Sequence, residues 1–154
     1  MKRSLVPYSI PSKLGADLTR VLAYWEGLKR GDAGMPFWDD VNLTALPDLS
    51  DRLMLIDVFD KPLRFRFETV GKELKERYGA NVIGKFSDEI EIKCPFQYFK
   101  SQCVATVESR IPTYYRHEAA RRQDSRTAEE FSRVILPMWG DGRIGMLLGA
   151  VAWG

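Results

Sequence analysis

Few side chains in this 154-residue sequence could move a proton near neutral pH, because it holds a single histidine, His117. Enzymes that isomerise or dehydrate small molecules need a buried Asp, Glu or His as a base. Asp57 and His117 are the candidates that the sequence pattern places near an apolar interior, and neither has an evident partner. A lone histidine also argues against a His-rich metal site, so no metal is expected.

The two cysteines are expected to be structural. Cys94 and Cys103 lie nine residues apart and would point to opposite sides of one helix, which makes them a poor disulfide pair. Reactive thiols sit among several cations, whereas Cys94 is flanked by Lys93 alone. Cys103 belongs to an apolar helical stripe, where a small hydrophobic residue is the ordinary occupant.

A glycine-rich run near the end of the sequence, Gly140 to Gly145, matches the G-x-G-x-x-G pattern of dinucleotide-binding proteins. That fingerprint requires a helix directly after the glycines, because the helix N-terminus meets the pyrophosphate. An apolar run with no helical pattern follows here instead. We therefore interpret Gly140-Asp141-Gly142 as a tight hairpin turn, in which glycine supplies the positive φ that such turns need.

Basic residues offer two candidate contacts for an acidic ligand or partner. Lys100 falls on the apolar face of a predicted helix, and its stem either reaches past the aromatic residues to water or projects the ammonium group into a cavity. A cluster of arginines, diluted by carboxylates, crowds the connection between two predicted strands. A solvated, ion-paired connection is expected there, with a docking surface for an acidic partner as the alternative. The cluster comprises Arg116, Arg121, Arg122, Arg126 and Arg133.

Composition sets the class of protein. The sequence has 23 Lys and Arg against 21 Asp and Glu, a net charge of +2, which argues against a dedicated nucleic-acid binder. Its length corresponds to one domain of about 150 residues. The longest apolar stretch, 146–153, is far shorter than the roughly 20 residues that cross a bilayer. Pro7 and Pro11 interrupt the apolar run that a signal peptide needs, so a cytoplasmic protein without membrane contact is expected.

The first regular element that the sequence predicts is an amphipathic helix over 12–30. Ser12 is its expected N-cap and Gly31 its expected stop. Its apolar residues recur at helical spacing and form one stripe. The stripe contains Leu14, Leu18, Val21, Leu22, Trp25 and Leu28.

Beyond residue 50 the pattern alternates between strand and helix. Alternation in 63–70 suits a half-buried antiparallel strand, and Asp60-Lys61-Pro62 provides a turn before it. Pro95 suits the first position of a second long helix. The arrangement predicts an α+β fold with one antiparallel sheet covered by helices on one side. The expected strands are 53–59, 63–70, 111–120, 129–139 and 143–153, and the expected helices are 72–78 and 95–109.

Several short segments, in this order and spacing, together resemble a stand-alone bacterial family of the PAS superfamily, over about residues 20–153. They are Tyr24-Trp25, the run FRFETVG at 65–71, Arg77-Tyr78-Gly79, the run VIGK at 82–85, and the run RVILPM at 133–138 followed by Gly142 and 146–148. The resemblance implies a single PAS-like domain over 1–154, with a leading helix at 12–30 and a PAS core at 50–154.

Such domains enclose an apolar cavity between a five-stranded sheet and short helices, and they sense small molecules, bind cofactors or dock on partner proteins. No cofactor is expected here. The flavin-adduct motif of light-sensing relatives is absent, and the helix that carries the ligand in haem-binding relatives has no histidine in this sequence.

The sequence leads to one main functional hypothesis, a non-enzymatic sensory or adaptor domain that acts on a protein partner of a signalling pathway. Its cavity either holds a small organic ligand or is a filled core. The stripe residues Leu18, Leu22, Trp25 and Leu28 can cover the sheet of their own chain or pair with a second subunit. Because PAS relatives often dimerise through a leading helix of this kind, the resemblance predicts a homodimer. The alternative is a small cone-like isomerase or dehydratase. The expected cavity residues are Phe65, Phe67, Tyr78, Phe99, Lys100, Tyr114, Ile135 and Met146.

Overall fold

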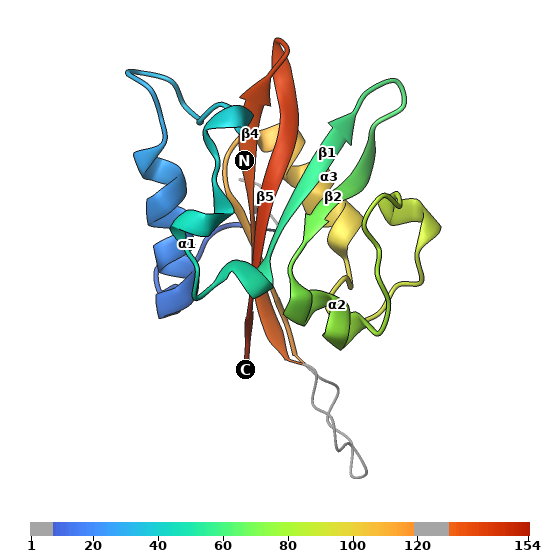
Figure 1. Ribbon diagram of the computed structural model, residues 1–154. Coiled ribbons are helices and arrows are strands. Elements are labelled where there is room, and N and C mark those ends of the chain that lie inside the picture. The colour runs from blue at the N-terminus through green and yellow to red at the C-terminus, as the bar shows by residue number, and fades with distance from the viewer. Residues whose placement is uncertain (1–7, 119–129) are drawn as a thin grey trace, which may run out of the picture.

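Five strands form one antiparallel sheet in the order β2-β1-β5-β4-β3 (Figure 1). The structure, a computed structural model, describes residues 8–118 and 130–154. Residues 1–7 and Arg121, Arg122 and Arg126 of the expected basic cluster lie outside the described residues. The sheet confirms the expected α+β class. Its strands are β1 (Leu53–Phe59), β2 (Arg64–Val70), β3 (Thr113–His117), β4 (Phe131–Gly140) and β5 (Arg143–Trp153).

Two hairpins build most of the sheet, and both turns lie where the sequence predicts them. In the β4–β5 turn, Asp141 and Gly142 have φ values of 56° and 77°. Positive φ at both central residues is the type I′ geometry that matches the twist of paired strands. The glycine-rich run is therefore a hairpin turn and not a phosphate-binding loop. Lys61, with φ 55°, lies in the β1–β2 turn.

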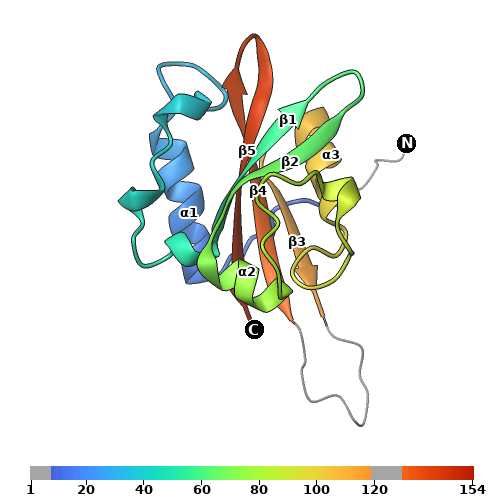
Figure 2. The same ribbon diagram turned by 45° about the vertical axis from the view of Figure 1, so that its right-hand side comes forward.

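Helices cover both faces of the sheet (Figures 1 and 2). The helices between β2 and β3 pack over one face, as expected, while the leading helix covers the opposite face, against β4 and β5. The sequence predicts helices on one face and an extra N-terminal amphipathic helix, whose packing it leaves open; the structure places that helix on the second face of the sheet. An apolar stripe on the leading helix needs an apolar sheet face to bury it, and the five strands provide one on each side. The helices are α1 (Ala16–Gly27), α2 (Lys72–Tyr78) and α3 (Phe99–Ser109).

The leading helix is shorter than the range 12–30 that its stripe predicts. Its first intrahelical bond joins the Thr19 amide to the Gly15 carbonyl, so Gly15 and not Ser12 precedes the helix. At the other end the Leu28 amide bonds the Trp25 carbonyl, which tightens the last turn at Gly27. Glycine is a poor helix former, and the helix ends where it occurs.

Helix α3 begins four residues later than Pro95 suggests. The residue before the helix, Tyr98, has a left-handed φ of 57°, and the chain from 95 to 98 is irregular. The carbonyls of Pro95 and Gln97 accept hydrogen bonds of 2.7 and 2.9 Å from the Arg133 guanidinium. Because these carbonyls are bound to a side chain from β4, this segment does not continue the helix toward its N-terminus.

Other segments partly pair the two edge strands. On β2, the Phe67 amide bonds the Lys85 carbonyl at 3.0 Å, and the Gly84 amide bonds the Phe67 carbonyl at 2.8 Å. On β3, the Tyr114 amide bonds the Tyr8 carbonyl at 2.8 Å. Exposed edges are ready templates for adding a foreign strand, and here part of each edge is already paired. Among the described residues, no helix has the length and apolar character needed to span a membrane.

Candidate functional site

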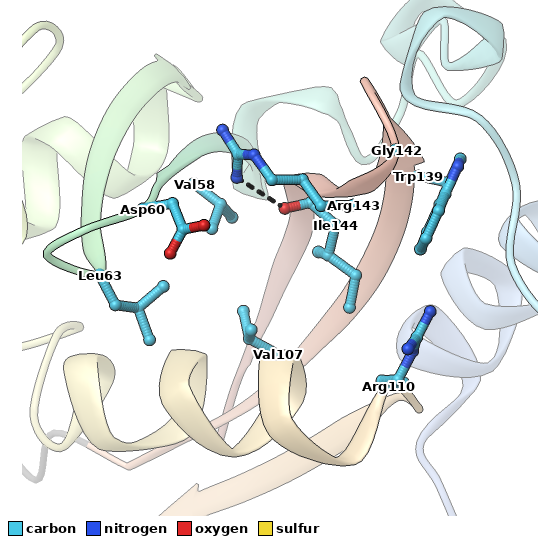
Figure 3. A pocket seen from close by; sticks show the side chains of 9 residues that line it. All are labelled: Val58, Asp60, Leu63, Val107, Arg110, Trp139, Gly142, Arg143 and Ile144. Carbon is cyan, nitrogen blue, oxygen red and sulfur yellow. Dashed lines mark hydrogen bonds between the residues drawn. The ribbon is translucent and has the colours of Figure 1, made fainter.

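A cleft of about 230 Å³ opens at the end of the sheet where both hairpin turns approach the C-terminal end of α3 (Figure 3). We call it the end cleft. Three parts of the fold meet there: the β1–β2 hairpin, the last turn of α3, and the β4–β5 hairpin. Its lining residues are Val58, Asp60, Leu63, Val107, Arg110, Trp139, Gly142, Arg143 and Ile144.

The floor of the end cleft is aliphatic. Val58 and Ile144 are 4% and 6% exposed, and Leu63 and Val107 are half-buried. Val58 is paired with Phe65 across the β1–β2 hairpin and shares its face of the sheet, the face that α3 covers. Val107 lies one turn after Cys103 on the buried side of α3, because residues four apart share one face of a helix. The floor is thus an extension of the core that remains open at the sheet end.

The rim of the end cleft carries two cations and one anion. Arg110 ends α3 in a left-handed conformation, with φ 62°, and its guanidinium carbon lies 5.3 Å from the centroid of the Trp139 ring. Arg143 donates a hydrogen bond of 3.1 Å to the Ile144 carbonyl. Figure 3 shows Arg110 beside Trp139 on one side of the opening, with Asp60 and the Arg143 guanidinium across from them. The charged groups of the rim therefore sum to one positive charge.

Most of the expected cavity residues are packed against one another instead of lining an opening. Phe65, Phe67, Phe99 and Ile135 are at most 2% exposed, and Tyr78 is 6% exposed. The rings of Phe67 and Phe99 stack with centroids 5.2 Å apart. The structure therefore brings these five residues together on the α3 side of the sheet, where they form core.

The other three expected cavity residues lie elsewhere. Lys100 is exposed, so its ammonium group reaches water instead of a cavity. Tyr115 contacts the α3-side Arg133, so its neighbour Tyr114 projects from the opposite face of the strand. Met146 lies on that opposite face too, in a hollow with Asp57 and Arg66. For Tyr114 and Met146 the sequence shows an apolar or aromatic side chain but not which face of the sheet it takes. The sequence groups Lys100 with them because it falls within the apolar arc of its predicted helix.

Arg133 is the largest departure from the expected basic cluster. Its side chain is fully buried and donates hydrogen bonds to Gln102 Oε1 and to the carbonyls of Pro95 and Gln97. Burial lowers the pKa of its guanidinium to about 10. It is therefore a core residue, not part of a solvated connection. Arg116 does follow the expectation, with ion pairs to Glu118 and Glu130.

The two acid–base candidates are far apart in the sheet, on β1 and β3, and each has a partner. Asp57 pairs with Arg66 over 2.8 Å. The Nδ1 atom of His117 lies 2.7 Å from the Tyr115 hydroxyl, and its ring stacks on Phe131. Neither residue lines the end cleft. The idea that they stand without partners is wrong.

The cysteines are buried, as a structural role requires. Burial raises the pKa of the Cys103 thiol well above its ordinary value, which keeps it protonated. In the described ranges, no group of three or more His, Cys, Asp or Glu side chains is arranged to hold a metal ion.

The leading-helix stripe is used within its own chain. Leu18 and Trp25 are each 1% exposed, and the Trp25 indole donates a hydrogen bond of 2.9 Å to the Pro137 carbonyl. Leu22 and Leu28 are half-buried. The helix therefore covers its own sheet, and the core of the stripe is not available to a second subunit.

Sequence reasoning missed the end cleft because its residues come from segments that are distant in the chain. For two of these residues the sequence did hold a hint that they lie at the end of an element. Arg110 directly follows a predicted helix, and Trp139 comes just before a predicted hairpin turn. Comparison of the chain with family profiles and with curated proteins finds no match.

Proposed function

We propose that the chain is a non-enzymatic sensory domain of the PAS type that binds a small organic ligand in the end cleft and acts on a partner protein. The observation that carries the proposal is the end cleft itself, with its aliphatic floor and charged rim. Ligand sites combine apolar walls with a few placed polar groups in this way. At about 230 Å³ the cleft is smaller than the sites of drug-sized ligands, which span about 300–1,000 Å³.

A surface next to the cleft supports the protein-binding half of the proposal. Phe37 and Trp38 are 36% and 42% exposed, and aromatic residues are enriched where proteins meet. Trp139 lines the end cleft and also a hollow with Phe37 and Trp38. The Trp139 amide bonds the Pro36 carbonyl at 2.8 Å, which ties this surface to β4. A partner bound at Phe37 and Trp38 would therefore lie close to the ligand.

The alternative of an isomerase or dehydratase rests on Asp57 or His117 as a base. Neither side chain lines the end cleft, and each is held by a neighbour, so no observation favours this alternative. A signalling homodimer, if one forms, has to use a surface other than the buried part of the α1 stripe.

Native mass spectrometry of freshly purified protein tests the ligand-binding proposal. We expect a retained small molecule in the wild-type protein and its loss in Val107→Trp, because the larger ring fills the cleft floor. Glu108→Trp is the matched control, since it adds the same ring at the next, exposed position of α3. If several wild-type preparations carry no added mass and no small molecule binds on titration, the proposal fails.

A further inference from the structure

We propose that the ligand of the end cleft is a small monocarboxylic acid with an apolar body, held by Arg110 through its carboxylate. This inference rests on the proposed function, because it names the class of molecule that the same cleft binds. Three features of the described residues support it: the pairing state of the arginines, the placement of Arg110, and the position of Asp60.

Within the part of the chain that the structure describes, the two arginines of the cleft differ from most of the other arginines in having no carboxylate partner. Six of the ten arginines in the described ranges form ion pairs with carboxylates there. Arg110 and Arg143 form no such pair with any described residue, although both reach the same opening (Figure 3). Most described guanidinium groups are ion-paired with carboxylates of the same chain. Two guanidinium groups without such a partner at one cleft therefore favour an anionic ligand.

Arg110 is placed to bind a carboxylate. Its guanidinium carbon lies 5.3 Å from the centroid of the Trp139 ring, which holds the group at the rim, and none of its N–H donors is in an ion pair with a described carboxylate. Carboxylates match that planar set of donors and can accept two parallel hydrogen bonds from it. The floor residues Val107 and Ile144 lie beside this position, so an apolar body attached to the carboxylate can cover them.

Asp60 limits the ligand to one negative charge. Its carboxylate stands across the opening from Arg110, on the side of Arg143 (Figure 3). A second carboxylate on the far end of a ligand would approach Asp60, and like charges repel. Arg143 already donates to the Ile144 carbonyl and lies on the Asp60 side of the opening, so Arg110 is the main anchor and Arg143 a weaker one.

Calorimetric titration with matched acid and amide pairs tests the inference. The probes are 3-phenylpropionate, hexanoate and indole-3-acetate, each compared with its neutral amide, which has nearly the same shape. We expect at least one acid to bind ten-fold or more tightly than its amide. Arg110→Gln should lower the affinity for that acid about ten-fold and Arg143→Gln about three-fold, without changing the affinity for the amide. Asp60→Asn should raise the affinity for the acid.

Arg77→Gln is the matched control variant. Arg77 also lies over a tryptophan, with its guanidinium carbon 4.1 Å from the centroid of the Trp153 ring, but it does not line the end cleft. Its replacement should leave the affinity for the acid unchanged. Circular dichroism melting of each variant checks that its fold is intact.

The outcomes separate the two proposals. If acids and amides bind equally, or if Arg110→Gln binds the acid like the wild type, the acid inference is overturned while a ligand-binding cleft stands. If no acid and no amide binds, and the purified protein carries no small molecule, both proposals fail together.

Discussion

The Nε atom of Arg133 donates a hydrogen bond of 2.7 Å to Oε1 of Gln102, and both side chains are fully buried. The amide nitrogen of Gln102 in turn donates to the Thr113 hydroxyl at 3.1 Å. One polar network thus joins β4 to α3 and β3. Three aromatic rings lie within 5.5 Å of the guanidinium carbon, and such rings attract a cation. The network fixes where α3 begins and supports the helix whose far end forms the cleft.

Replacing Arg133 with methionine should lower the free energy of unfolding by about 3 kcal/mol. The aliphatic side chain fits a core but leaves the Gln102 oxygen and two backbone carbonyls without their donor, and each buried unpaired group costs about 1–3 kcal/mol. Urea unfolding at neutral pH measures the change. Arg77→Met, at an exposed site, should cost less than about 0.5 kcal/mol. Equal stability of the two variants would show that the Arg133 network adds nothing.

The buried Cys103 thiol should make the protein less stable above pH 9. Its pKa is raised in the folded state from an ordinary value of 9.0, so the unfolded chain loses this proton first as the pH rises. The contribution of the protonated thiol to the free energy of unfolding is complete below pH 9 and declines above it. Between pH 8 and pH 10 the expected loss from this one group is about 1.4 kcal/mol.

Urea unfolding at pH 8 and pH 10 for Cys103→Ala checks this loss. The variant should lose about 1.4 kcal/mol less than the wild type between the two pH values, whatever its absolute stability. Val104→Ala is the control, because it shortens a side chain on the same helix without removing a titratable group. Parallel pH profiles for wild type and Cys103→Ala would contradict the prediction.

The sheet could be predicted because its sequence signals depend on residues that are close together in the chain. Alternation in β2 and the glycines of the β4–β5 turn depend on neighbours within a few positions. The burial of Arg133 could not be predicted, since a charged side chain is expected to be exposed to solvent unless its hydrogen-bond partners are known. Its hydrogen-bond partners lie 31 to 38 positions away. The end cleft could not be predicted for the same reason, because three segments that are distant in the sequence form it.

Gly71 occupies a position that admits no side chain. A Cβ atom there would overlap the backbone carbonyl of Asp51, and a backbone atom cannot move aside as a side chain can. Gly71→Ala should therefore lower the free energy of unfolding by about 3 kcal/mol, the upper part of the range for overpacking. At Gly27 an added Cβ meets nothing within 4 Å, and alanine is the better helix former. Gly27→Ala should raise stability slightly, so opposite signs in thermal unfolding are the expected result.

Replacing Trp25 tests whether helix α1 covers the sheet of its own chain or pairs two chains. Because its ring is buried against its own strands and bonded to Pro137, Trp25→Ala should lower the free energy of unfolding by about 3–5 kcal/mol. The half-buried Leu22, changed to alanine, should cost less. The unfolding midpoint of the wild type should not change over a ten-fold range of protein concentration. Trp25 packs within its own chain, so unfolding separates no subunits at this helix. A midpoint that rises with concentration, together with a Trp25→Ala variant that stays folded as a monomer in light scattering, would instead assign the stripe to a dimer interface.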